Sequence, residues 1–295
     1  MLPNPKCNKI ILQLNDMLES GNVNQIELRK IKKNLLDLRS TDPVNAHVVL
    51  GIISCLEHNI AEMRKNHELA IKFQNDSHTV GNYSVSLSKY GLYLESAKYS
   101  LIAFEKDKKD LQHFRYVRDQ FFYSGQFSSC LIFLKKYKPL YINDPGEYQQ
   151  ITVNEQIIDL ILRFLHTHNI SEQDVINAIS ASLEITQKKS LLLVDPNISL
   201  MSFSDEEWLD ISFVIRLRND SSSVLEELDA RFDSFNPIIK EFISIDFEIE
   251  NGPVSKIITK IDENHFKESQ FDESQFSDLD KNMISRISNA LDLKK

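Results

Sequence analysis

Apolar and small residues recur with a period of about 34 positions in the first half of this chain. The segments 82–103 and 116–137 follow one pattern, in which the matching pairs are Gly91 and Gly125, Tyr93 and Phe127, Ser96 and Cys130, and Ala103 and Tyr137. Each segment reads as a helix, a turn and a second helix. Gly91 and Gly125 fall at the turn, where glycine adopts a left-handed conformation without a side-chain penalty. The pattern predicts helical hairpins that bury their apolar faces by stacking on one another.

A weaker copy of the unit precedes these two. Leu50-Gly51 lies 33 positions before Tyr83-Ser84, and His58 stands at the turn in place of glycine. A more degenerate first unit spans residues 14–43. The helical hairpin pattern therefore extends over most of the first half of the chain.

With these landmarks, residues 10–140 resemble the tetratricopeptide-repeat (TPR) family. The usual first-helix tryptophan is missing, and several of the usual alanines are replaced. The resemblance implies a helical solenoid that holds other molecules and performs little chemistry. Two alternative folds are another array of helical hairpins and an ordinary all-helical domain that contains two similar hairpins.

The hydrophobic period changes in the second half. Residues 155–166 and 171–183 have helical spacing, and Ser171 with Asp174 reads as a helix cap. Strands are predicted at 190–194, 198–203, 210–218 and 243–249, with a helix at 224–235. This order predicts a small α+β domain in which one sheet face packs on helices. The predicted fold class is therefore α+β multidomain, with an all-α TPR-like solenoid in front.

The segment 139–146 contains two prolines and a glycine and reads as a domain boundary. We therefore expect a repeat domain at 1–140, an α+β domain at 147–260, and an acidic linker with a short C-terminal helix at 261–295. In the linker, Phe266, Phe271 and Phe276 recur every five residues among acidic residues. Such isolated aromatic residues are typical of a docking segment, so these three are predicted partner-binding residues.

Charge is distributed unevenly along the chain, whose formal net charge is −9. Residues 1–150 hold 20 lysines and arginines against 16 acidic residues, whereas residues 151–295 hold 14 against 27. The net charge disfavours general affinity for nucleic acid. The uneven distribution predicts that the basic half binds an acidic segment, either of a protein partner or of another copy of this chain.

The cellular compartment follows from three observations. No apolar run reaches the length of about 18 residues that a membrane span needs, and the N-terminus does not read as a secretory signal. Cys7, Cys55 and Cys130 lie far apart, without disulfide or zinc spacing. We therefore expect a cytoplasmic protein, with a composition typical of bacteria or viruses, that has no membrane contact, cofactor or metal.

The sequence has no phosphate loop, dinucleotide-binding glycine pattern, nucleophile elbow or paired-histidine zinc helix. The best catalytic candidate is Arg163 followed by His168, a spacing that resembles the short signature of the HEPN ribonucleases. The resemblance implies that the arginine stabilises charge on the scissile phosphate and that the histidine assists attack by the ribose hydroxyl. The alternative is an ordinary helix end, where His166 and His168 face the terminal carbonyls.

Acidic residues at 205–207 and Asp210 offer a second candidate site, since carboxylates near a sheet can hold a divalent cation. The run that begins at Ser204 is more typical of a helix start, with a serine cap and acidic residues in the first turn. The acidic residues within 246–250 alternate along a predicted strand, and we interpret them as a solvated sheet face.

The predicted partner-binding residues of the repeat half are Arg115, Arg118, Lys135 and Lys136. The sequence as a whole predicts a non-catalytic protein–protein interaction adaptor or scaffold subunit of a multiprotein complex. The alternative is a ribonuclease or nucleic-acid-binding subunit of a microbial defence or toxin system, such as phage defence, in which the same basic residues bind the nucleic acid.

Overall fold

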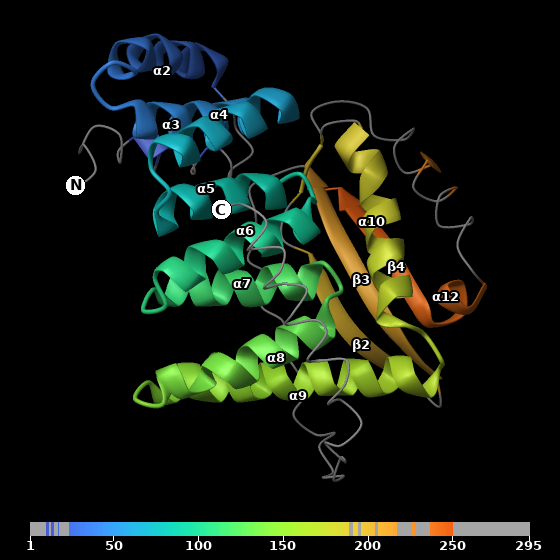
Figure 1. The fold of residues 1–295 in the computed structure, drawn as a ribbon. Helices are drawn as coiled ribbons and strands as arrows, with labels where there is room; N and C mark the ends of the chain where they lie inside the picture. The colour runs from blue at the N-terminus through green and yellow to red at the C-terminus, as the bar shows by residue number, and fades with distance from the viewer. Residues whose placement is uncertain are drawn as a thin grey trace. The chain divides into compact units, whose positions relative to one another are not determined.

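Figure 1 shows helices α2 to α9 stacked one after another, with α10 and a sheet running along one side of the stack, beside α5 to α9. In this computed structural model the described residues are 10, 11, 13, 14, 17, 24–188, 191–193, 196–203, 206–216, 226, 227, 230 and 237–249. They belong to the compact unit Met1–Val254. The predicted docking residues Phe266, Phe271 and Phe276 and the predicted C-terminal helix lie outside the described residues.

The helical part is built from α-helices, and from α2 to α9 each helix packs on the next. Their bounds are α2 Gln25–Leu38, α3 Pro43–Leu56, α4 Ile60–Phe73, α5 Ser77–Ser88, α6 Tyr93–Lys106, α7 Leu111–Tyr123, α8 Phe127–Tyr137, α9 Pro145–Thr167 and α10 Glu172–Lys188. A short 3-10 helix, η1 Lys138–Tyr141, links α8 to α9. Among the described residues no helix combines the length and apolar composition that a bilayer crossing requires.

Short polar side chains begin most of these helices. The side-chain oxygens of Asn24, Asp42, Asn59, Asp76, Asp110 and Asp144 accept hydrogen bonds from backbone N–H groups of the following turn. Such caps satisfy donors that have no partner inside the helix. At the start of α10, Ser171 N–H donates to Asp174 at 3.2 Å and Asp174 N–H donates to the Ser171 hydroxyl at 3.1 Å. The predicted cap of this helix is confirmed.

The hairpin turns have the predicted left-handed backbone. Gly91 and Gly125 have φ angles of 68° and 75°, and His58 in the equivalent position has 59°. All three turns share two hydrogen bonds. The residue after the left-handed position donates five residues back, as in Leu92 N–H to the Leu87 carbonyl at 3.1 Å, and the left-handed residue donates three residues back. This is the Schellman arrangement, so one local geometry ends the first helix of three successive hairpins.

Helix crossings repeat as well. The Ser96 hydroxyl donates to the Ser84 carbonyl at 2.8 Å, and the Cys130 thiol donates to the Arg118 carbonyl at 3.4 Å. Both pairs join the two helices of one hairpin at matching positions, and Ser96 and Cys130 are fully buried. A small polar side chain at the crossing lets the two helices approach closely.

One mixed sheet follows the helices. Among the described residues its strands are β1 Leu192–Leu193, β2 Asn197–Phe203, β3 Glu206–Arg216 and β4 Ile243–Ile249. The central strand β3 pairs antiparallel with β1 and β2, and parallel with β4. Helix α12, Pro237–Phe242, leads directly into β4. An all-α region followed by a small α+β part is therefore confirmed, and so is the strand predicted at 243–249.

The helix start predicted at 204–207 is wrong, because Glu206 and Glu207 open strand β3. Pairing with β2 places Leu209 opposite Leu200, and Leu209 is fully buried. Long-range pairing and burial thus outweigh a local helix-start pattern. Of the helix predicted at 224–235, the described residues 226, 227 and 230 are helical, and the others lie outside the described part of the chain.

One apolar core joins the helices to the sheet. It includes Tyr93 on α6, Phe164 on α9 and Phe213 on β3, and the rings of Tyr93 and Phe213 stack with centroids 6.4 Å apart. The segment 139–146, predicted as a domain boundary, forms part of η1 and the first turn of α9. Because α8 packs on α9, this core has members on both sides of that segment.

Candidate docking cleft

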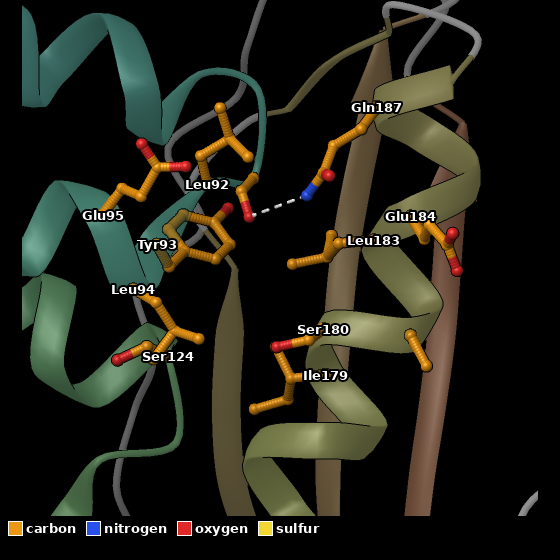
Figure 2. Close-up of a pocket in the computed structure, with 12 residues that line it drawn as sticks. Leu92, Tyr93, Leu94, Glu95, Ser124, Ile179, Ser180, Leu183, Glu184 and Gln187 are labelled. Atoms are coloured by element: carbon orange, nitrogen blue, oxygen red, sulfur yellow. Dashed lines mark hydrogen bonds between the residues drawn. The ribbon is translucent and has the colours of Figure 1, made fainter.

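The described surface is hollowed between the start of α6 and the face of α10. The cleft has a volume of about 400 Å³. Figure 2 shows Tyr93 and Leu94 of α6 on one wall and Ile179, Leu183 and Gln187 of α10 on the other. Clefts of this size are typical sites for small molecules or for an inserted side chain of a partner.

Glycines at the hairpin turns allow α10 to come close. A Cβ atom on Gly91 would lie 2.7 Å from Leu193 Cδ1 and 3.1 Å from Leu183 Cδ2. A Cβ atom on Gly125 would lie 3.1 Å from Ile179 Cδ1. The two turn glycines therefore have two structural roles. They adopt a left-handed backbone conformation, and their lack of a side chain leaves room for α10.

Two long-range hydrogen bonds hold this contact. The Gln187 side-chain amide donates to the Gly91 carbonyl at 3.4 Å, as Figure 2 shows. The Leu193 N–H, in β1, donates to the Lys89 carbonyl at 2.9 Å. A backbone group and a side chain of the second half of the chain thus satisfy the Lys89 carbonyl at the end of α5 and the Gly91 carbonyl in the turn that follows.

The inner surface of the cleft is apolar and its rim is polar. Tyr93, Ile179 and Leu183 are almost completely buried, whereas Leu94 is 42% exposed. Glu184 and Gln187 lie at the α10 side of the rim. Leu94 therefore places an exposed apolar side chain beside this hollow.

The acidic groups of the rim are already paired with cations of the same chain. Arg64 donates two hydrogen bonds to Glu95, at 2.5 and 2.7 Å, and these bonds raise the pKa of Arg64. Lys188 lies 3.1 Å from Glu184. The rim of the cleft therefore offers hydrogen-bonding groups around an apolar interior. Because its acidic residues are paired, the rim has no strong net charge of either sign.

The four basic residues predicted to bind partners lie on α7 and α8, away from the residues that line the cleft. Arg115 pairs with the buried Glu147, and Arg118 pairs with Asp119 at 2.7 Å. Lys135 and Lys136 are exposed in the last turn of α8, and the Lys136 ammonium lies 4.7 Å from the Tyr137 ring centroid. Both arginines are thus used inside the chain, so their free positive charge is smaller than the sequence implies.

We expect Arg115→Ala to lower the free energy of unfolding by about 1–3 kcal/mol. Only 3% of the Glu147 side chain is exposed, whereas 42% of Arg115 is, so the variant leaves a buried carboxylate without its cation. Urea denaturation followed by circular dichroism measures the change. Adding Glu147→Gln should recover part of the loss, and Lys136→Ala should change stability by less than about 0.5 kcal/mol. An equal effect of Arg115→Ala and Lys136→Ala would contradict the role of the buried carboxylate.

The two residues of the HEPN-like spacing lie at the end of α9 but face different neighbours. Arg163 forms an ion pair with Asp159, one turn earlier. The His168 ring lies 4.6 Å from the Phe164 ring and 4.0 Å from the Phe242 ring, measured between centroids. The ring of His168 helps to pack α12 on α9, as an ordinary helix-end residue does.

Thiol chemistry has no support in the described part of the chain. Cys55 and Cys130 are fully buried, and burial raises the pKa of the Cys55 thiol to about 12 and that of Cys130 further. A thiolate is the reactive form, so both residues act as small packing groups.

The candidate carboxylate site at 205–210, which the sequence pattern disfavoured, is not assembled in the described residues, since Glu207 and Asp210 lie along an extended strand. One group of metal-type ligands that was not predicted does come together: His78, Asp110 and His113. Its sequence signal is a pair of histidines separated by about one repeat, with an aspartate three residues before the second.

The cleft can therefore bind an apolar group and form hydrogen bonds with the atoms around that group. Its two walls come from helices about 90 residues apart in the sequence, which only the folded chain brings together. Comparisons with protein-family models, with curated proteins and with solved structures found no match to this chain.

Proposed function

We propose that this chain is a non-catalytic adaptor of the TPR-like kind, which binds a protein segment in the cleft between α6 and α10. The observation that carries the proposal is the exposed Leu94 beside an apolar hollow at the turn of a repeated hairpin. Three hairpins whose first helices end in the same left-handed turn support a helical-repeat scaffold, a fold that mostly serves to hold other molecules.

The chemistry of the cleft describes the ligand. The exposed Leu94, backed by the buried Tyr93 and Leu183, suits contact with one aliphatic or aromatic side chain. Gln187 offers hydrogen bonds to the backbone beside that side chain. Because the rim acids Glu95 and Glu184 have cations of their own, a highly charged ligand gains little here. We therefore propose a short, mostly uncharged segment of a protein partner as the ligand.

The ribonuclease alternative has weaker support. Arg163 contacts Asp159, and His168 packs between aromatic rings. A general base needs a ring nitrogen within hydrogen-bond reach of the substrate hydroxyl, and an arginine that stabilises phosphate needs to lie beside it.

Leu94→Arg should weaken partner binding at least about tenfold, because it places a charge at the mouth of an apolar hollow. Leu160→Arg is the matched control, since Leu160 on α9 is 40% exposed and Leu94 is 42% exposed. A photo-crosslinking amino acid at position 94 in the source cells identifies the partner segment by mass spectrometry. Calorimetry with that segment then compares the two variants.

Equal affinity of the Leu94→Arg and Leu160→Arg variants for the crosslinked segment would count against the cleft as the binding site. A chain that is solitary by native mass spectrometry of its own cell extract, and that forms no crosslink at position 94, would count against the adaptor function. Melting temperatures of both variants provide the folding control, because both leucines are substantially exposed.

A further inference from the structure

Three side chains with metal-binding atoms meet where α5 and α7 begin. His78 lies in the first turn of α5, Asp110 is the N-cap of α7, and His113 lies in the first turn of α7. One ligand atom from each lies within 4.8 Å of the other two. His113 Nε2 is 3.7 Å from Asp110 Oδ2, and the two imidazole rings have centroids 5.9 Å apart. Ligands around a tetrahedral zinc lie about 3.4 Å from each other, given metal–ligand distances of about 2.1 Å.

The stacking of hairpins produces this meeting. His78 and His113 are 35 positions apart, close to the repeat period, so the first helices of successive hairpins bring them together. Gly81 on α5 makes room for the second ring, since a Cβ atom there would lie 2.9 Å from His113 Cε1. The His113 ring therefore packs directly against the backbone of α5.

The ligand atoms are oriented and available. Asp110 Oδ1 accepts hydrogen bonds from the N–H groups of Gln112 at 2.8 Å and His113 at 3.4 Å, which fixes the carboxylate and leaves Oδ2 directed at the imidazole. His113 Nε2 is buried and has no hydrogen-bond partner among the described residues. A buried ring nitrogen without a partner is unusual, and a metal ion is one group that would satisfy it.

One electrostatic effect opposes a cation here. The N-terminal ends of α5 and α7 both carry positive partial charge toward the cluster. Burial lowers the pKa of His113, and His78 acts in the same direction, whereas the carboxylates of Asp110 and Asp107 act with the opposite sign. Asp76, the N-cap of α5, also acts on His78, so carboxylates oppose the positive helix ends at both histidines. Direct coordination by the imidazole and carboxylate atoms would then decide whether a cation binds.

We propose that His78, Asp110 and His113 form a binding site for a divalent transition metal, with Zn²⁺ as its best match. Two imidazoles and one carboxylate are ligands that zinc accepts, and three protein ligands leave a fourth position for water or for a partner's side chain. His78 is exposed, so rotation of its side chain closes the remaining distance. The ion would link α5 to α7 and so hold two successive hairpins together.

Titration of tag-free protein with zinc chloride tests the proposal by calorimetry and by the melting temperature. We expect saturable binding of one equivalent and a higher melting temperature with zinc. Cobalt in place of zinc should give visible absorption bands of a low-symmetry site. His78→Ala and Asp110→Asn should each weaken zinc binding at least about tenfold. Asparagine still caps a helix, so the second variant keeps the start of α7.

His166→Ala is the matched control, because His166 is another exposed histidine, in the last turn of α9. It should leave zinc affinity unchanged. Absence of saturable binding at one equivalent would overturn the proposal, as would equal affinity of wild type, His78→Ala and Asp110→Asn. An equal loss in His166→Ala would show that zinc binds scattered surface histidines, and would overturn it too. Melting curves without metal show that each variant is folded.

Discussion

Gly91→Val is expected to lower the free energy of unfolding by about 2–5 kcal/mol, the largest effect of any substitution considered for this chain. Gly91 has a φ angle of 68°, which a β-branched residue adopts only with strain. The new Cβ atom would also lie 2.7 Å from Leu193 Cδ1 and 3.1 Å from Leu183 Cδ2. Valine therefore strains the hairpin turn and separates it from α10 and β1. Urea denaturation followed by circular dichroism measures the loss.

Substitutions at two further glycines separate the effect of backbone strain from the effect of steric overlap. Gly125→Val has the same backbone strain at φ 75°, but its nearest neighbour, Ile179 Cδ1, would be 3.1 Å from the new Cβ atom, so a smaller loss is expected. Gly146→Val is the control, because a Cβ atom there meets only Asp144 Oδ1 at 3.6 Å, and valine is the better helix former. Its effect should stay below about 0.5 kcal/mol. Equal losses at all three glycines would refute the account.

Acid should destabilise the fold through His67, the second large effect. His67 is fully buried, and burial lowers the pKa of its imidazole from 6.5 to about 3. At pH values between about 3 and 6.5, His67 is protonated in the unfolded chain but not in the folded chain. The free energy of unfolding therefore falls as the pH falls below 6.5. The loss is about 1.4 kcal/mol per pH unit, or about 2 kcal/mol at pH 5. Above pH 6.5 this histidine has no pH effect.

His67→Gln isolates the effect, because glutamine keeps polar atoms near the Ser86 hydroxyl, which lies 2.8 Å from His67 Nε2, and takes up no proton in this range. The variant loses the stacking of His67 on Tyr83 at all pH values, so the comparison uses slopes rather than absolute stabilities. Urea denaturation at pH 7, 6 and 5 should give a steeper decline for the wild type. Parallel declines would show that His67 stays neutral in the unfolded chain or is protonated in the fold.

Local features of the fold were predictable from the sequence. The left-handed turns at Gly91 and Gly125 follow from a glycine between two amphipathic helices, and the cap of α10 follows from Ser171 with Asp174. Strand β4 was predicted at its observed bounds because Ile243–Ile249 alternates strictly. Each of these predictions depends on neighbours within a few positions, which the sequence displays directly.

Features that depend on distant pairing were not predictable in the same way. The start of β3 at Glu206 is decided by its pairing with β2, and not by the serine and acids that resemble a helix start. The cleft lies between segments that are far apart in the sequence, since Gln187 donates to the carbonyl of Gly91, 96 positions away. Arg115 and Glu147 pair across 32 positions, so the sequence overstated the free basic charge of α7. The histidine cluster does have a sequence signal, because His78 and His113 are separated by about one repeat period. Polar residues as well as apolar ones therefore follow the repeat.

The position of α10 has a mechanical consequence. In an open array each hairpin contacts only its neighbours and can rotate slightly against them. These small rotations add up to bending of the whole array. Residues of α10 lie against the turns of two successive hairpins, at Gly91 and at Gly125. Helix α10 therefore restricts the rotation of one hairpin relative to the other. The pair α5–α6 and the pair α7–α8 should therefore move as one stiff block. A ligand that binds between this block and α10 enters a preorganised site. Binding should therefore cost little conformational entropy of the protein.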